Sequence, residues 1–218
     1  LINKSIYSLP ELSGNKIKRF QIIGCPGCYP TSILLPIIPL IKKNYIKKNN
    51  IIIDSKSGYS GAGRKVHSKF KNKNLYESLS AYGINLHRHN SEIEQEIRNY
   101  TKSKFSFTFT PHLTPMFRGI LSTIYIDLND GITVNNLYNQ LINFYKKSKF
   151  IKVIKMNSLL STNDVINTNI CKISVCKSKY KGKAIILSAI DNLIKGGAGQ
   201  AIQNLNLLND FNYNEGFK

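Results

Sequence analysis

Alternating and helical patterns of apolar residues divide most of the chain into strands and helices. In "KFSFTFTPHL" the phenylalanines at 105, 107 and 109 recur at every second residue, which predicts a strand with one buried face. The spacing of apolar residues in "NSEIEQEIRNYTK" and "TVNNLYNQLINFYKKS" instead predicts two amphipathic helices. Their inward positions are Ile93, Ile97 and Tyr100 in the first helix, and Val134, Leu137, Leu141 and Phe144 in the second.

Two continuous apolar runs need a different interpretation. "NNIIIDSKSG" predicts a short buried strand that opens into the glycine-rich loop "SGYSGAGRK". "KRFQIIGCPG" ends another strand, and "CYPTSILLPIIPLIKKNY" continues as a helix with Pro30 in its first turn. Pro36 and Pro39 predict a kink or an early stop of that helix, because proline removes a backbone donor and its ring clashes with the preceding turn.

Further strands are expected in "RGILSTIYIDL", "FIKVI", "NICKISVCK" and "KAIILSAID", and a final helix in "NLIKGGAGQAIQNLNLLND". We expect Pro111, His112 and Pro115 in the connection between the strand at 105–110 and the next one. Strands and helices intermix, and short turns join neighbouring strands. The pattern therefore predicts an α+β fold with a mixed, largely antiparallel sheet and helices on one face.

Composition and charge restrict the function classes. The formal net charge of +19 invites a nucleic-acid interpretation. However, lysine travels with Asn and Ile throughout, as in "IKKNYIKKNN", and arginine occurs only at positions 19, 64, 88, 98 and 118. Biased codon usage explains this pattern better than phosphate recognition, which favours arginine. We therefore expect no specific nucleic acid as a partner.

No apolar run approaches the ~20 residues of a membrane span, and the start "LINKSIYSLP" has no signal-peptide pattern. We expect a cytoplasmic protein with reduced cysteines and no membrane partner. The chain reads as a fragment of something longer.

The candidate nucleophile lies in "QIIGCPGCYPT", where Cys25 and Cys28 are three residues apart. Cys28 stands at a strand-to-helix junction, and a helix N-terminus lowers a thiol pKa and so favours the reactive thiolate. A redox pair with Cys25 and an inert thiol remain open alternatives. Pro30 places the expected helix start after Cys28, which disfavours the redox pair. Zinc is disfavoured because no second cluster exists, and Cys171 and Cys176 read as strand residues on opposite faces.

A cysteine nucleophile needs a base, and "LHRHNSEIEQ" places His87 and His89 on either side of Arg88. Two imidazoles and a guanidinium in three residues favour a site that holds an anion. The loop "SGYSGAGRK" can cradle a phosphate or a ring through its backbone N–H groups, although it matches neither a Walker loop nor a dinucleotide fingerprint.

Five blocks in order carry a family resemblance: "PGCYPT", "SGYSGAGRK", "HRHNSEIEQEI", "FTPHLTPMFRGIL" and "DNLIKGGAGQAIQNLN". With "YSLPELSGNKIK" they make the chain, from Tyr7 to about Leu207, resemble N-acetyl-gamma-glutamyl-phosphate reductases of the NADP-dependent semialdehyde dehydrogenase family. The resemblance implies a glyceraldehyde-3-phosphate dehydrogenase-like catalytic domain whose preceding Rossmann half is mostly missing. It divides the chain into the tail of the dinucleotide-binding domain (1–27), a catalytic and dimerisation domain (28–190) and a C-terminal helix that returns to the cofactor site (191–218).

The resemblance also implies the chemistry, which is the third step of arginine biosynthesis. Cys28 would form a thioester with N-acetyl-glutamyl phosphate and release phosphate, and NADPH would reduce the thioester to the semialdehyde. His89, with His87 second, would move the proton, and Arg88 and Arg118 would bind the anionic substrate. The implied cofactor-binding residues are Ser57, Gly58, Gly61, Gly63, Asn192, Gly196 and Gly197. A homo-oligomer, dimer or tetramer, is implied as well.

The chain also departs from the family pattern. Cys25 replaces the asparagine that usually precedes Pro-Gly-Cys, and Asn90-Ser91-Glu92 replaces Thr-Pro-Glu after the histidines. These departures leave one alternative to an active reductase open, an inactive remnant or split-gene fragment that keeps the fold and the dimer interface. The basic charge leaves a second, weaker alternative, a nucleic-acid-binding module.

Overall fold

The main sheet forms because its strands alternate between a buried and an open face. In β3 (Ile51–Gly58), Ile51, Ile53 and Ser55 are buried, whereas Ile52 is 48 % exposed and its neighbours at every second position are half-buried. The same alternation occurs in β5 (Phe107–Thr114) and β6 (Ile120–Asp127). A period of two places alternate side chains on opposite faces of a sheet, so these strands bury one face only.

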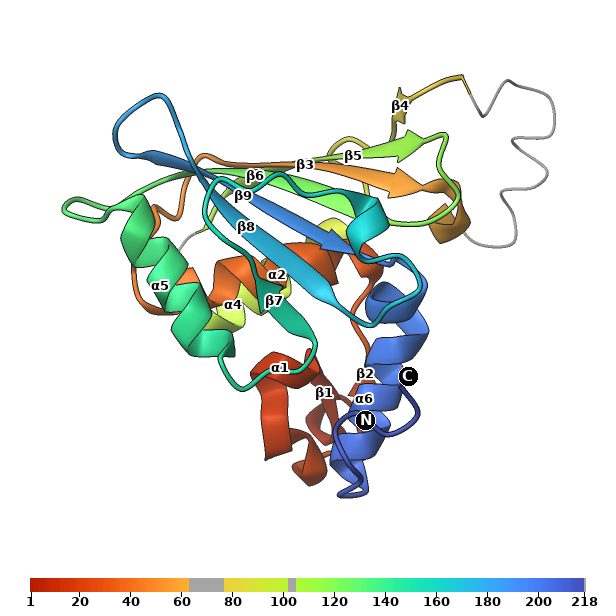
Figure 1. Cartoon of the computed structure of the whole chain (residues 1–218). Helices are drawn as coiled ribbons and strands as arrows, with labels where there is room; N and C mark the ends of the chain where they lie inside the picture. The colour runs from red at the N-terminus through yellow and green to blue at the C-terminus, as the bar shows by residue number, and fades with distance from the viewer. Residues whose placement is uncertain (63–76, 102–104, 218) are drawn as a thin grey trace.

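Seven strands of the described chain form this sheet in the order β4-β5-β3-β6-β9-β8-β7 (Figure 1). β3 pairs in parallel with β5, and β7 with β8, whereas β4–β5, β3–β6, β6–β9 and β8–β9 are antiparallel. The bounds of the other four strands are β4 (Ser80–Ala81), β7 (Ile151–Val153), β8 (Cys171–Lys177) and β9 (Lys183–Ile190). The prediction of a mixed, largely antiparallel sheet is confirmed.

The expected position of His112 was wrong. Pro111 and His112 lie inside β5, paired with Ser55 and Lys56 of β3, and not in a connection between strands. β5 and β6 are consecutive in the sequence, but β3 lies between them in the sheet.

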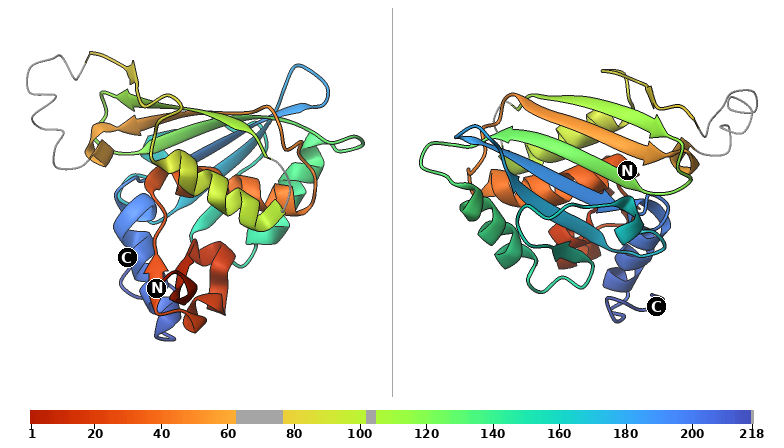
Figure 2. Two further views of the ribbon diagram at one scale, coloured as in Figure 1. Left: turned by 180° about the vertical axis from the view of Figure 1, so that it is seen from behind. Right: turned by 45° about the horizontal axis from the view of Figure 1, so that its top comes forward.

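The α-helices cover only one face of the sheet, as predicted. α2 (Cys28–Lys42), α4 (His89–Thr101) and α5 (Val134–Tyr145) pack together beneath it (Figure 2). The opposite face carries no α-helix in the described part of the chain, but the short 3-10 helix Thr162–Asp164 packs there at the β9 end of the sheet, where Leu160 and Val165 contact Ala189. The core between helices and sheet is aliphatic, with Ile33, Leu34, Ile124 and Ile186 fully buried. Burial of this apolar area supplies the main driving force for the fold.

α2 is not stopped by its prolines. It continues through Pro36 and Pro39 to Lys42, so the expectation of an early stop was wrong. Pro39 cannot donate to the carbonyl of Leu35, but the hydroxyl of Tyr145 on α5 donates to that carbonyl at 2.6 Å. A long-range hydrogen bond therefore replaces the missing local one.

The amphipathic helices bury nearly the residues that their spacing predicts. Ile93 and Ile97 of α4 are fully buried. In α5, Leu137 and Leu141 are buried, but Phe144 is 36 % exposed and its neighbour Tyr145 is buried instead. In the last turn of α5 the buried residue is thus Tyr145, one position after the predicted Phe144.

A second, smaller layer holds both ends of the chain. β1 (Ser5–Tyr7) and β2 (Ile22–Gly24) form a two-stranded parallel sheet, with α1 (Pro10–Ser13) between them in sequence. α6 (Gly199–Leu208) lies beside this layer, and Ser8 donates a hydrogen bond to Asn204 at 2.7 Å (Figure 1). The first and last segments therefore meet below the helices.

The computed structural model describes residues 1–62, 77–101 and 105–217. Within these ranges, no helix has the length and apolar character that a membrane crossing requires. The same residues contain no group of three or more His, Cys, Asp or Glu side chains placed to hold a metal ion.

Candidate active site

Cys28 is the first residue of α2, after the N-cap Gly27. The helix therefore begins at Cys28 and not after it, so the helix start no longer argues against a redox pair with Cys25. Backbone N–H groups of Tyr29 and Cys28 lower the thiol pKa, as expected at a helix N-terminus, where these groups lack helical partners.

The pKa of Cys28 nevertheless moves in the opposite direction from the prediction. Burial raises it to about 11, and this effect outweighs the backbone N–H groups and the positive charge of Arg88. The negative charge of Glu92 raises it further. In this chain the thiol is protonated at neutral pH, so attack requires a base that accepts its proton.

His89 is packed onto the nucleophile turn. It opens α4, is 5 % exposed, and lies so close to Gly27 that a Cβ at Gly27 would be 2.3 Å from its Nε2. Only glycine fits at that position. Burial lowers the pKa of His89 to about 4, although Glu92 raises it partly, and its Nε2 lies 3.8 Å from Glu92 Oε1. The imidazole is therefore neutral at pH 7 and able to accept a proton.

His87 packs against His89 and hydrogen-bonds to its backbone. The ring centroids are 4.7 Å apart, and Nδ1 of His87 accepts a hydrogen bond from the backbone N–H of His89 at 3.1 Å. His87 also packs edge-on against Tyr29 and Phe109. The contact with Gly27 favours His89 over His87 as the base next to Cys28.

Glu92 is a site residue that our sequence analysis did not identify. One of its oxygens, Oε2, accepts hydrogen bonds from the backbone N–H of Gly27 at 3.0 Å and from the hydroxyl of Tyr7 at 2.8 Å. Its position three residues after His89 puts both on one face of α4, and that spacing was the available signal. Glu92 ties the N-terminal layer, the nucleophile turn and His89 together.

The first part of the glycine loop, residues 57–60, is held by internal hydrogen bonds. The N–H groups of Gly58, Tyr59 and Ser60 donate to the carbonyls of Gly119, Met116 and Phe117, at 2.8, 3.0 and 3.1 Å. The buried hydroxyl of Ser57 donates to the carbonyl of Gly58 at 2.9 Å. These N–H groups are thus not free to cradle a phosphate, contrary to the expectation. Gly63 lies outside the described residues.

Asn192 joins this loop to the segment after β5. Its Oδ1 accepts from the N–H of Gly119 at 2.7 Å, and its Nδ2 donates to Ser60 Oγ at 3.0 Å. Gly61 packs against the same amide, where a Cβ would be 3.1 Å from Nδ2. Both ends of the Asn192 amide are engaged within the chain.

Gly196 is brought directly against the nucleophile. It lies in the turn Ile194–Ala198, and a Cβ on it would be 2.6 Å from the Cβ of Cys28. Gly197 leaves helical geometry there, with φ −155° and ψ −107°. A Cβ on Gly197 would make only an ordinary van der Waals contact, with Asn192 O at 3.6 Å.

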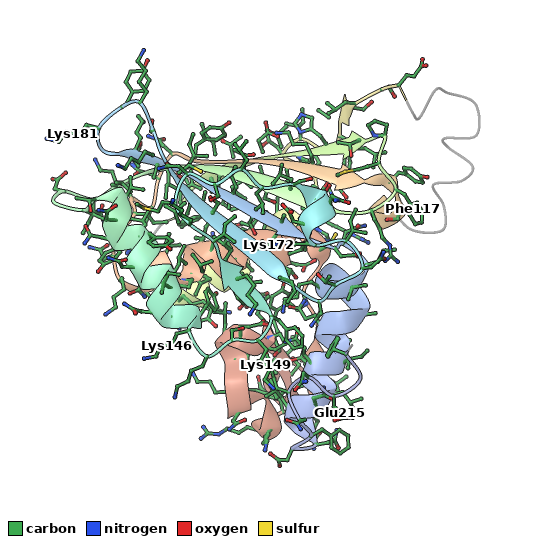
Figure 3. The ribbon with its side chains drawn as sticks, in the orientation of Figure 1. Phe117, Lys146, Lys149, Lys172, Lys181 and Glu215 are labelled. Atoms are coloured by element: carbon green, nitrogen blue, oxygen red, sulfur yellow. The ribbon has the colours of Figure 1, made fainter. Side chains whose placement is uncertain are left out.

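The two predicted substrate-binding arginines have different surroundings. Arg88 is exposed, and its charge lowers the pKa of Cys28. Arg118 is 26 % exposed and donates from Nη1 to Asp191 Oδ2 at 3.2 Å and to Asn167 Oδ1 at 2.5 Å. It lies at the end of the sheet where Phe117 projects outward (Figure 3).

Cys25 and His112 lie apart from this chemistry. Cys25 is exposed and forms no disulfide, and Asn204 Nδ2 lies 3.5 Å from its sulfur. His112 faces Asp54 on the neighbouring strand, with Nδ1 and Oδ1 3.1 Å apart.

Comparisons with known proteins identify the family of this chain. A profile of the semialdehyde dehydrogenase dimerisation domain matches residues 28–192. A probable chloroplastic N-acetyl-gamma-glutamyl-phosphate reductase of Arabidopsis thaliana is 46 % identical over 93 % of this chain and 51 % of its own length. The N-acetyl-gamma-glutamyl-phosphate reductase of Clostridium botulinum (strain Alaska E43 / Type E3) is 46 % identical over 99 % of this chain and 63 % of its own length.

Solved structures of similar fold are more distant in sequence. Aspartate semialdehyde dehydrogenase II of Vibrio cholerae superposes with a TM-score of 0.75 at 14 % identity, over 95 % of this chain and 69 % of that one. The aspartate semialdehyde dehydrogenase of Francisella tularensis gives 0.71 at 15 % identity, over 94 % and 71 %. The chain spans between half and two thirds of the length of the curated relatives that it matches.

Proposed function

Because this chain belongs to the semialdehyde dehydrogenase family through its dimerisation domain, we propose that it is the catalytic part of an N-acetyl-gamma-glutamyl-phosphate reductase. The observation that carries the proposal is the Cys28 thiol at the start of α2, together with a buried neutral His89 that packs onto the preceding residue, Gly27. The relatives that cover nearly the whole chain carry that reductase name.

Three parts of the chain divide the work in this proposal. Residues 1–27 are the tail of a dinucleotide-binding domain, 28–190 form the catalytic and dimerisation domain, and 191–218 return to the active site. The parallel pair β1–β2 supports the first assignment, because parallel strands with a helical connection are the unit from which dinucleotide-binding sheets are built. The contact of Gly196 with Cys28 supports the last.

Cys28 performs the acyl transfer. Its sulfur attacks the acyl carbon of N-acetyl-glutamyl phosphate while the thiol proton passes to the neutral imidazole of His89. A carbon–sulfur bond forms, the bond from carbon to the phosphate oxygen breaks, and phosphate leaves with that electron pair. Glu92 then stabilises the imidazolium, since its carboxylate raises the pKa of His89. The products of this half-reaction are a Cys28 thioester and phosphate.

The anionic ends of the substrate need positive charge. Arg88 is exposed and acts on Cys28 electrostatically, which suits the phosphate that leaves from the reacting carbon. Arg118 suits the carboxylate, because a guanidinium binds carboxylates through two parallel hydrogen bonds.

Family membership indicates a nicotinamide cofactor, and we propose NADPH. When bound, the cofactor supplies the hydride that reduces the thioester. Among the predicted cofactor residues in the described ranges, a Cβ on Gly197 would meet only Asn192 O at 3.6 Å, whereas the N–H groups of Gly58, Tyr59 and Ser60 and the amide of Asn192 are engaged internally. In this proposal the nicotinamide end lies near Gly197, and the phosphates take donors from outside these residues.

The open face of the main sheet suits the dimer interface of this proposal. Tyr125 and Ile52 are large, 43 % and 48 % exposed, and directly paired across β3 and β6. A homodimer or tetramer would cover them. All four cysteines are free, which supports a reducing compartment such as the cytoplasm.

Two observations favour the alternative of an inactive remnant. The pKa of Cys28 at about 11 leaves little thiolate at neutral pH, and the N–H groups of Gly58, Tyr59 and Ser60 are bonded within the chain. The remnant would keep the fold and the dimer face without acyl transfer.

Intact-protein mass spectrometry after incubation with N-acetyl-L-glutamyl 5-phosphate separates the two. We expect one N-acetyl-glutamyl adduct on the wild-type chain and on Cys171→Ser, and none on Cys28→Ser. Absence of an adduct on the wild-type chain, with its circular dichroism spectrum intact, would favour the remnant.

A further inference from the structure

Asp191 is a fully buried carboxylate that the acyl-transfer chemistry leaves unused. Its Oδ1 accepts hydrogen bonds from the N–H groups of Leu193 at 2.8 Å and Ile194 at 3.0 Å. Its Oδ2 accepts from Arg118 Nη1 at 3.2 Å and from the N–H of Asn167 at 2.8 Å. A buried carboxylate with four donors is fixed in place, and it can fix the groups that donate to it.

Asn167 completes the hold on the arginine. Its Oδ1 accepts from Arg118 Nη1 at 2.5 Å while its own N–H donates to Asp191. The residue has φ +62°, a left-handed conformation that asparagine tolerates and most residues avoid. That conformation lets one residue contact both partners of the ion pair.

These contacts use Nη1 of the guanidinium. A guanidinium carries five N–H donors, and Nε and Nη2 make no hydrogen bond to the described part of the chain. A cavity of about 510 Å³ lies at this point, lined by Arg118 and Asn167 with the apolar side chains of Met116, Phe117 and Ile166. Its volume is typical of small-molecule sites.

Asp191 also precedes the turn that packs on Cys28. The N–H of Gly196 donates to the carbonyl of Asp191 at 2.9 Å, and Gly196 packs on Cys28. Asp191, which binds Arg118, and Gly196, which packs on Cys28, are therefore only five residues apart in the sequence.

We propose that Asp191 and Asn167 are positioning residues that orient Arg118 to receive the carboxylate of an N-acyl amino acid while Cys28 receives the acyl carbon. The inference rests on the proposed function, since it takes Arg118 as a substrate-binding residue. It adds Asp191 and Asn167 as the two residues that orient the guanidinium of Arg118.

Two variants separate orientation from folding. Asp191→Asn keeps an oxygen for Leu193 and Ile194 but turns an N–H₂ donor toward Arg118 and Asn167. Asn167→Gly keeps the left-handed backbone and its N–H but removes the acceptor for Arg118. Asn44→Gly is the matched control, since Asn44 also has a positive φ (+56°) and makes no contact with Arg118.

The readout is protection of Cys28 from iodoacetamide by N-acetyl-L-glutamate, followed by peptide mass spectrometry in a Cys25→Ser background. We expect the half-protecting concentration to rise about tenfold in Asp191→Asn and Asn167→Gly, with the rate without ligand unchanged. Asp191→Asn also removes a negative charge, which alone would strengthen anion binding, so weaker protection isolates orientation. Asn44→Gly should match the parent chain.

Each other outcome overturns a stated part. Protection of the parent chain that both variants retain, or that Asp191→Asn strengthens, overturns the positioning role and leaves the proposed function standing. No protection of the parent chain overturns the role of Arg118, and with it both this inference and that part of the proposed function. A changed rate without ligand in both variants assigns the two residues to folding of the turn and overturns the inference.

Discussion

Cys28 and Cys171 are two cysteines in nearly the same chemical state but in different parts of the fold. Burial raises both pKa values, to about 11 for Cys28 and about 12 for Cys171. Cys28 opens a helix, where N–H groups of the first turn point at the thiol and His89 packs on the preceding glycine. Cys171 is the first residue of β8, where its N–H donates to the carbonyl of Phe150 at 2.8 Å and its sulfur lies 3.5 Å from Ser188 Oγ.

The difference shows that a raised thiol pKa does not by itself mark a structural cysteine. Burial sets the direction of the shift at both sites, whereas the position in the element decides which groups can take the proton. Cys28 follows a glycine onto which a neutral histidine packs, whereas the sulfur of Cys171 contacts the hydroxyl of Ser188. Nucleophilic character here comes from a proton acceptor and not from a preformed thiolate.

Removing the proton acceptor His89 should have the largest effect on the reactivity that distinguishes Cys28 from Cys171. His89→Gln should slow formation of the acyl adduct by about 10²- to 10⁴-fold, the usual contribution of a general base. His87→Gln should have a much smaller effect, because His87 contacts His89 and not Gly27. Rapid-quench mass spectrometry measures both rates, and equal losses would mean that the two histidines act as one unit.

Crowding the thiol should have the next largest effect. Gly196→Ala places a Cβ 2.6 Å from the Cβ of Cys28, so the turn must shift. We expect a loss of about 1–3 kcal/mol in unfolding free energy and slower alkylation of Cys28, measured by urea unfolding and thiol labelling.

Gly24→Ala is the control for that substitution, since its Cβ would meet only ordinary contacts at 3.6 Å. Equal stability of the two alanine variants would contradict the close contact of Gly196 with Cys28.

Removing the charge of Glu92 or of Arg88 should have the smallest effect, and the two changes should move the pKa of Cys28 in opposite directions. Glu92 raises the pKa of Cys28, so Glu92→Gln lowers it and shifts the labelling curve to lower pH. Arg88 lowers that pKa, so Arg88→Gln shifts the curve to higher pH. Each shift should change the rate at fixed pH by about threefold, because partly exposed charges are screened, and neither should affect Cys171. Shifts of the same sign would refute the electrostatic account.

Local patterns in the sequence predicted the elements and the sheet type. The period of two in β5 and the period of α4 depend only on neighbours along the chain, and both hold, although β5 begins at Phe107 and leaves the predicted Phe105 outside the strand. The order of strands depends on distant pairing, so the insertion of β3 between β5 and β6 was not predicted. The continuation of α2 past Pro39 depends on a hydroxyl 110 residues away.

The site follows the same division. Gly27 and Cys28, with His89 close by, were expected from a glycine before a helix and from clustered histidines. The role of Glu92 required the contact between α4 and the turn before α2, which joins residues 65 positions apart. The pKa of Cys28 was predicted in the wrong direction because helix position is visible in the sequence, whereas burial by the distant turn that holds Gly196 is not.

Labelling by iodoacetamide from pH 7 to 11, with peptides of Cys28 and Cys171 resolved in a Cys25→Ser background, tests the central claim most directly. The account predicts that Cys28 is labelled along a curve that rises toward pH 11, while Cys171 stays unlabelled until the chain unfolds. A Cys28 curve with its midpoint below the ordinary thiol pKa of ~8.5 would contradict it, because the thiolate would then be preformed. Equal, slow labelling of both cysteines would also contradict it, because Cys28 would then be only a core residue.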